Sequence, residues 1–152
     1  MSLRASLAAL LVALCAVAAC EVGAQQNASS FAVVDVYIDS AEPLAAWQFE
    51  LSDGGGAMQV VGIEGGENAT FREPPFYDRA AVERGAADRI IVASFSLSEP
   101  AGLVRGRARV ASVHVRQLGG GEPEYELRLV AAGAADGRAI DARISLQLRT
   151  GR

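Results

Sequence analysis

The residues that could carry catalysis are few, and they form no recognised catalytic arrangement. His114 is the only histidine, and it stands between Val113 and Val115 in an alternation typical of a strand. Ser94 and Ser96 also fit a strand pattern, whereas a hydrolase nucleophile stands on a sharp turn. One histidine without a neighbouring cysteine makes a poor transition-metal site. We therefore predict no catalytic residue and no enzyme activity.

Carboxylate and amide oxygens suggest a second kind of chemistry, the binding of calcium. Asp35 with Asp39, or Glu64 with Glu67 and Asn68, would supply the hard oxygen ligands that this ion prefers. Surface acids in contact with water are far commoner than calcium sites. We therefore interpret these residues as solvated acids and predict no cofactor and no metal ion.

Two groups of residues have the composition of a binding surface. The first is the outward face of the last strand pattern, with charged and hydrogen-bonding side chains at Arg143, Ser145, Gln147 and Arg149. Arg143 and Arg149 share a face and stand about 20 Å apart along it, and such a face suits recognition of a protein. The second is an aromatic loop with Phe71, Phe76 and Tyr77 around Pro74-Pro75, which as the alternative would bind carbohydrate.

The elements that must position these groups are strands. Apolar residues alternate with polar ones most clearly around Trp47, which with Phe49 and Leu51 is expected to face the core and not a sugar. The same period of two predicts strands over 31–38, 45–51, 58–63, 89–97, 105–117, 125–131 and 140–148. Helical periodicity is almost absent, so the fold class is all-β, a two-layer antiparallel sandwich.

Turn residues separate these strands. We expect a turn over 39–43, a loop or hairpin turn at Asp53–Gly56, and a hairpin-type turn at Asp136-Gly137. The prolines at 74 and 75 place their segment in a loop or at a sheet edge. Residues 78–88 form either a short helix, ended by Gly85, or a polar excursion.

Length and charge limit the function classes. A chain of 152 residues is expected to form one domain. Its net charge of −4 disfavours nucleic acid as a partner, because phosphate neutralisation needs a basic surface.

The first 24 residues have the features of a secretory signal. An apolar run over 7–19 is too short to span a bilayer but suits the core of a signal peptide. Cleavage before Cys20 would leave a lipidated cysteine, and a site ending at Ala24 would release the protein. The alternatives are an envelope protein attached to the membrane only by the lipid on Cys20, or an extracellular protein. Residues 25–30 would form a short linker and 31–149 the domain.

The order of elements over 31–148 resembles a bacterial cohesin domain. The likeness rests on Val34 and Val36, on the strands at 47–51, 60–63 and 89–95, on Val113-His114-Val115, and on the closing pair 125–130 and 140–148. It implies a nine-stranded, jelly-roll-like sandwich without enzymatic activity. Members of this family hold dockerin modules of polysaccharide-degrading complexes through one sheet face. The expected partner is therefore a protein, dockerin-like in the first instance, and polysaccharide is the alternative.

Overall fold

The computed structural model describes residues 29–85, 87–119 and 123–150. The expected signal segment 1–24, Cys20 included, lies outside the described residues, as does most of the expected linker. No helix among the described residues has the length and apolar character that crossing a membrane requires.

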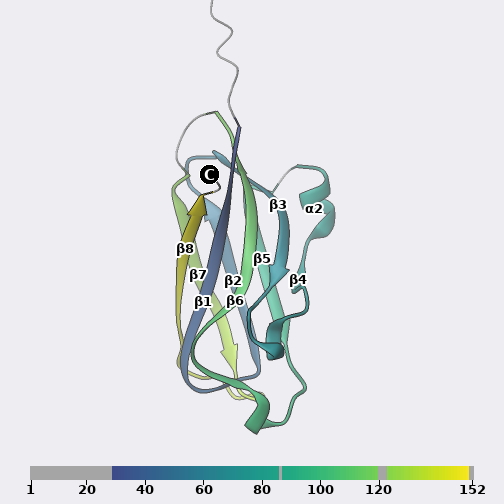
Figure 1. Ribbon diagram of the computed structural model, residues 1–152, viewed down its shortest axis with the longest axis vertical. Helices are drawn as coiled ribbons and strands as arrows, with labels where there is room; N and C mark the ends of the chain where they lie inside the picture. The colour runs from purple at the N-terminus through teal and green to yellow at the C-terminus, as the bar shows by residue number, and fades with distance from the viewer. Residues whose placement is uncertain (1–28, 86, 120–122, 151–152) are drawn as a thin grey trace, which may run out of the picture.

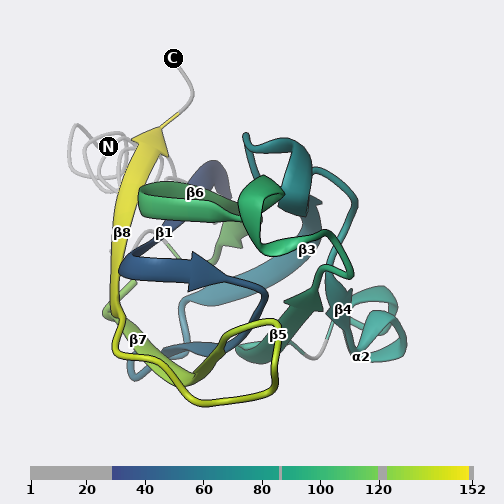
Figure 2. The ribbon, with the colours of Figure 1, turned by 90° about the horizontal axis from the view of Figure 1, so that it is seen from below.

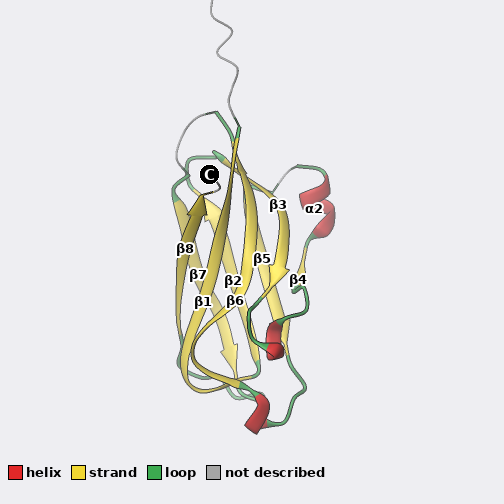
Figure 3. Cartoon of the chain, viewed as in Figure 1, coloured by secondary structure: helices red, strands yellow, loops and turns green. Residues whose placement is uncertain are grey.

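Two antiparallel four-stranded sheets pack face to face (Figures 1 and 3). Their orders are β3-β6-β1-β8 and β4-β5-β2-β7. The strands are β1 (Ser30–Leu44), β2 (Ala46–Asp53), β3 (Met58–Gly65), β4 (Phe76–Tyr77), β5 (Arg89–Phe95), β6 (Val104–Gln117), β7 (Tyr125–Gly133) and β8 (Arg143–Thr150). The prediction of an all-β, two-layer antiparallel sandwich is confirmed, with eight strands in the described residues where the resemblance implied nine.

The core lies between the two sheets and is centred on Trp47. This side chain is only 2% exposed. Its ring stacks on Phe49 with centroids 5.4 Å apart and meets Phe71 edge-on at 5.8 Å. The strict alternation of buried and half-buried residues along β2 follows from the period of two in its sequence. Trp47 is therefore a core residue, as its pattern predicts.

The turn expected over 39–43 is not a turn, and β1 continues to Leu44. Two register shifts against β6 bend the strand, one at Val36/Tyr37 and one between Ser40 and Leu44. The Ser40 hydroxyl accepts a hydrogen bond from the Glu42 amide, which satisfies the backbone where the ladder is interrupted. The ladder resumes at Leu44, and Ala45 then leads directly into β2 in the other sheet. Turn-type residues here produce a bulge within β1, and the chain crosses to the other sheet only after Leu44.

Two expected hairpin turns connect strands of different sheets. The Asp136-Gly137 turn is present, with Gly137 at φ 82°, and it closes a short hairpin in which Gly133 pairs antiparallel with Ala139. Beyond this hairpin the chain crosses from β7 to β8, which belong to opposite sheets. The loop at Asp53–Gly56 likewise crosses from β2 to β3, so loop is the correct one of its two alternatives. Its shape is fixed by the Asp53 carboxylate, which accepts hydrogen bonds from four backbone amides, those of Gly55, Ala57, Met58 and Glu124.

The segment after β3 forms one side of the sandwich. It contains two short helices, η1 (Ala69–Phe71) and α2 (Arg79–Glu83), with β4 between them. A third short helix, η2 (Pro100–Gly102), lies later in the chain, between β5 and β6. The double proline leads into β4, the edge strand of its sheet, as the missing amides require. The helical alternative for 78–88 is the correct one, because Asp78 caps α2 and Gly85 follows it at φ 67°. Viewed from below, β4 and α2 stand at the side opposite β7 and β8 (Figure 2).

Candidate functional site

The outer face of the β4-β5-β2-β7 sheet carries an apolar hollow of about 380 Å³. Its floor consists of small side chains on three neighbouring strands, Ala46, Ala93 and Ala131. The hollow exists because β5 is apolar on both faces. Ile90 and Val92 are buried in the core, which leaves the alternate residues Ile91, Ala93 and Phe95 on the outside. No described element covers that outer face, so this apolar surface is in contact with water.

Two aromatic rings form one wall of the hollow. Phe76 on β4 and Phe95 on β5 stack in parallel, with centroids 5.8 Å apart and an interplanar angle of 3°. Their exposed fractions are 65% and 56%, which is high for phenylalanine. Large contiguous patches of exposed apolar side chains on a monomeric protein commonly mark an interaction site. The apolar hollow thus has the character of an interaction site.

A charged triad lies beside the apolar hollow on the same face. Glu50 accepts two hydrogen bonds from Arg89, at 2.9 and 2.7 Å, and one from Arg128 at 3.0 Å. The hydrogen bonds from Arg89 and Arg128 hold the pKa of Glu50 below its ordinary value. Two guanidinium groups against one carboxylate give the triad a net charge of about +1. The two arginine side chains remain more than half exposed and can meet an anionic group on a ligand.

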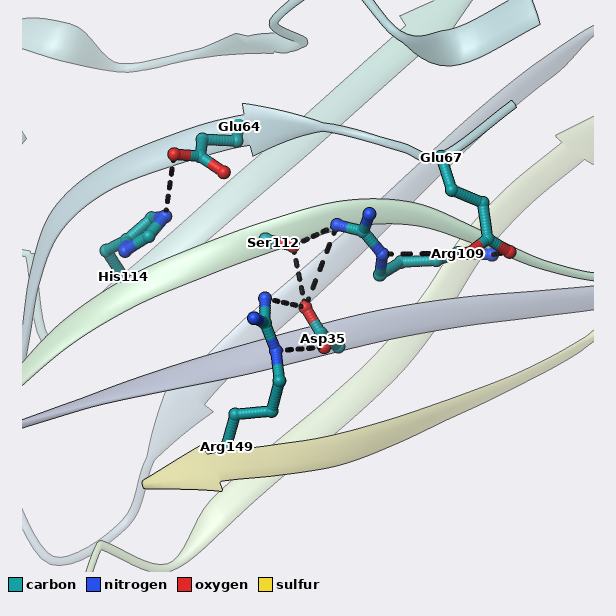
Figure 4. A network of polar contacts seen from close by, with 7 residues as sticks. All are labelled: Asp35, Glu64, Glu67, Arg109, Ser112, His114 and Arg149. Atoms are coloured by element: carbon teal, nitrogen blue, oxygen red, sulfur yellow. Dashed lines mark hydrogen bonds and ion pairs between the residues drawn. The ribbon is translucent and has the colours of Figure 1, made fainter. Parts of the chain in front are cut away.

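The other sheet carries a polar network on its outer face (Figure 4). Asp35 on β1 accepts hydrogen bonds from Ser112 at 2.6 Å and from Arg149 at 2.5 and 2.9 Å, and Arg109 lies 3.8 Å away. Burial raises the pKa of Asp35, but the hydrogen bonds from Arg149 and Ser112 outweigh burial, so the pKa lies below its ordinary value. The network is satisfied by the protein itself, and Ser112 is completely buried. It therefore offers no reactive hydroxyl to a substrate.

Cohesins are among the solved structures that resemble this chain. A non-cellulosomal cohesin from the hyperthermophilic archaeon Archaeoglobus fulgidus matches with a TM-score of 0.55 and 16% sequence identity, over 76% of this chain and 75% of that chain. The fold is cohesin-like. At this level of identity the likeness concerns the fold alone.

Two further structures are weaker matches to the cohesin-like sandwich. The seventh ScaB type I cohesin from Pseudobacteroides cellulosolvens has a TM-score of 0.48 and 14% identity, over 73% of this chain and 74% of that chain. The type I cohesin–dockerin complex Coh-OlpA-Doc918 from Clostridium thermocellum has a TM-score of 0.46 and 9% identity, over 71% and 91%. No protein-family model matches the chain, and no curated protein matches it.

The residues expected on the outward face of the last strand do share that face. Arg143, Ser145, Gln147 and Arg149 are all exposed, and the residues between them turn inward. Arg149 is held by Asp35, so its guanidinium group is already engaged. The charge of this face is therefore partly neutralised by Asp35, whereas the rings of Phe76 and Phe95 in the apolar hollow stay exposed.

The structure separates the members of the expected aromatic loop. Phe71 is buried in the core against Trp47 and presents no ring to a ligand. Tyr77 is half-buried, with the Arg79 guanidinium 5.5 Å above its ring. Only Phe76 is widely exposed, and it forms part of the apolar hollow together with Phe95.

Apart from Asp39, which is exposed on β1, the residues considered for calcium have other partners. Asp35 is bound by arginine, the Glu67 carboxylate accepts from the Arg109 amide, and Asn68 caps η1. Glu64 lies 3.2 Å from His114, which is half-buried on β6 (Figure 4). Within the described residues, no three acidic, histidine or cysteine side chains cluster as a metal site requires.

The sequence analysis did not predict Phe95, which lines the apolar hollow, or Ile91, which is exposed on the same face of β5, as binding residues. The signal was present, since the strand pattern over 89–97 is apolar on both faces. Every strand of a two-layer sandwich packs one face on the core and turns the other to solvent, so only one face needs to be apolar. A second apolar face on such a strand indicates a surface that another molecule covers.

Proposed function

We propose that this protein is a non-catalytic binding module that recognises a protein partner through the apolar hollow. The observation that carries the proposal is the exposed, stacked pair Phe76 and Phe95 beside a floor of alanines. The cohesin-like fold supports it, because the resemblance to cohesins implies a non-catalytic module that binds dockerin-like proteins. A dockerin-like module is accordingly the first partner to test.

The chemistry of the hollow suits an apolar side chain of a partner. Exposed aromatic rings around a small-residue floor are the type of anchor site that dominates binding energy at protein interfaces. The positively charged triad at Glu50, Arg89 and Arg128 would meet a carboxylate on the same partner and fix its orientation.

Carbohydrate remains the second candidate because Phe76 and Phe95 are exposed aromatic rings. A sugar site also needs several convergent hydrogen-bonding side chains. Of the residues that line the hollow, only Gln48 and Ser94 have polar side chains apart from the indole of buried Trp47. The lining therefore favours protein over polysaccharide.

The test compares two equally exposed phenylalanine sites. Binding of the full chain to a panel of purified dockerin modules, and to insoluble polysaccharides, is measured for the wild type and for Phe76→Ser with Phe95→Ser. The matched control is Phe31→Ser, which is 61% exposed and lies on the other sheet. We expect the double variant to weaken protein binding at least about 30-fold, the effect of losing a hot spot of about 2 kcal/mol. The control keeps wild-type affinity.

Two results would contradict the proposal. Undiminished protein binding by the double variant would place the site elsewhere, with the Arg143–Arg149 face next in line. Binding of polysaccharide alone, lost in the same variant, would establish the carbohydrate alternative.

We further propose that the protein is exported before it binds its partner. The apolar run over 7–19 and the small residues before Cys20 and up to Ala24 support this. Mass spectrometry of the N-terminus from the producing cell is the test. An intact Met1 would contradict export, and a diacylglycerol on Cys20 would select the envelope over the extracellular medium.

A further inference from the structure

Strand β8 is an edge strand with an open side. It bonds to β1 from Asp39↔Arg143 to Ala32↔Thr150, and no strand of the described residues bonds to its other side. An edge of eight residues with unpaired backbone groups is a template for another strand. In Figures 1 and 2 this edge lies along one side of the sandwich, next to β7 of the opposite sheet.

The inward side chains near this edge are only partly covered. Ile144 and Leu146 are half-buried, and Leu148 is 49% exposed. The residues that face them from β7, Leu127 and Leu129, are also half-buried. A strand added to β8 with apolar inward residues would therefore continue this incompletely closed side of the core.

We propose that the added strand is β8 of a second copy of this chain, antiparallel and centred on Ser145. The two inward rows are then apolar throughout, because Ile144 faces Leu146 of the second copy and Leu148 faces its Ala142. On the outward side Arg143 faces Gln147, and Arg149 faces Asp141, an opposite-charge pair that occurs twice by symmetry. Strand β8, together with the two residues that precede it, Asp141 and Ala142, is thus complementary to itself in this register.

Neighbouring registers lack this complementarity. Centring on Leu146 would place Arg143 directly opposite Arg149 in both halves, and like charges in such positions are destabilising. Centring on Gln147 would place Arg149 opposite Ser145 and leave Asp141 without its cation. A shift by a single residue would oppose inward to outward side chains, which the alternation of a strand forbids.

The intramolecular contact of Arg149 is compatible with this pairing. Asp35 engages Nε and Nη2 of the guanidinium group, which leaves Nη1 for a second carboxylate. Arginine can meet two carboxylates in this way because its five donors lie in one plane. Asp141 is exposed. The Ser40 hydroxyl donates its hydrogen bond to the backbone oxygen of Asp141 and not to its carboxylate.

The pairing has a consequence for binding. Two four-stranded sheets would join into one continuous sheet through β8, whereas the apolar hollow belongs to the other sheet of each copy. The dimer would then present two hollows and bind a repetitive partner bivalently.

Cysteine cross-linking tests both the dimer and its register. In the full chain, Ser145→Cys places two thiols opposite each other on the two-fold axis, within the Cα separation of about 4.4–6.8 Å that a disulfide requires. The matched control Gln147→Cys places its thiols four residues out of register, about 13 Å apart. Cys15 and Cys20 are present in every sample, so the bridge is identified by mass spectrometry of the cross-linked peptide. We expect a 145–145 disulfide in Ser145→Cys and no 147–147 disulfide in the control.

A charge substitution tests the same register without cross-linking. Gln147→Arg opposes a new arginine to Arg143 of the second copy at two symmetric positions, so the dimer dissociation constant in analytical ultracentrifugation should rise about 2- to 30-fold. Ala101→Arg adds the same charge at an exposed site in η2 and should leave the constant unchanged.

Either of two outcomes would overturn the inference. One is a folded Ser145→Cys protein that stays monomeric at all accessible concentrations. The other is a dimer that cross-links equally through residue 147 or is insensitive to Gln147→Arg, since such a dimer would use a different surface. Loss of partner binding in the Phe76 and Phe95 variant affects neither measurement, so the two proposals fail separately.

Discussion

Two buried carboxylates show how single residues hold this sandwich together. Asp35 is neutralised by arginine, whereas Asp53 is surrounded by backbone amides. Burial raises the pKa of Asp53, but the hydrogen bonds from Gly55, Glu124, Ala57 and Met58 outweigh burial, so the pKa lies below its ordinary value. In the folded protein both residues stay ionised at lower pH than in the unfolded chain.

Because the pKa values of Asp35 and Asp53 are both lowered, the free energy of unfolding must fall as the pH is lowered. A carboxyl group with a lowered pKa stabilises the fold fully above its unfolded pKa, near 3.8, and this stabilisation is lost as the pH falls through the folded value. We expect the free energy of unfolding, from urea melts, to decrease below about pH 4. Asp53→Asn should lower it by about 1–3 kcal/mol at pH 7 and flatten the acid slope. The exposed control Asp88→Asn should keep the wild-type slope, and an equal slope in both variants would refute the role of Asp53.

The indole ring of Trp47 fills a large aromatic site between the two sheets. Trp47→Ala should cost about 3–5 kcal/mol, because it empties a large aromatic site in a close-packed core. Trp47→Phe should cost less, because it retains a ring against Phe49 and removes the indole Nε1–H, which is buried without a hydrogen-bond partner. Thermal and urea melts followed by circular dichroism measure both. A smaller loss for alanine than for phenylalanine would mean that packing is not the main contribution of Trp47.

Local sequence patterns determine the individual strands and helices of this chain, but not how the strands pair. The alternation around Trp47 predicts both the strand and its buried face, and Asp78 with Gly85 delimits α2. The pairing of strands is a different matter. A turn within one sheet and a connection between two sheets use the same turn residues, as at Asp136-Gly137 and Asp53–Gly56. Only the packing of the two sheets decides that both segments connect strands of different sheets. The apolar hollow was recognisable only in part, because the sequence shows that β5 is apolar on both faces but not that its pairing with β4 brings Phe95 next to Phe76.

The backbone just after β3 lies very close to the backbone of β6. Gly66 follows β3, and a Cβ at this position would lie 2.3 Å from the backbone oxygen of Arg109 on β6. Backbone cannot give way as a flexible side chain does, so Gly66→Ala should destabilise the protein by about 1–3 kcal/mol. Gly62, within β3, is the matched control, because a Cβ there meets nothing within 4 Å. Equal melting temperatures for the two alanine variants would mean that β3 can shift away from β6.

The whole molecule is organised by contacts between distant parts of the sequence. Strand β1 pairs with β6 and β8, so that Asp35 contacts Ser112, 77 residues away, and Arg149, 114 residues away. It also passes through Ala45 into β2, which lies at the centre of the other sheet. The β3-β6-β1-β8 sheet is complete only when the first and last strands have met, and β1 continues through Ala45 into the other sheet. We therefore expect the two sheets to fold as one cooperative unit.

This topology predicts slow and cooperative folding. Closing loops of this length is entropically costly before the long-range contacts form, and sandwiches with such contacts fold in about milliseconds to seconds. Stopped-flow refolding followed by the fluorescence of Trp47 should show one main phase in that range, with the same rate by far-UV circular dichroism. Removing the Asp35–Arg149 contact by Arg149→Gln should mainly speed unfolding if β8 docks after the transition state. Submillisecond refolding, or different rates from the two probes, would show that one sheet forms independently of the other.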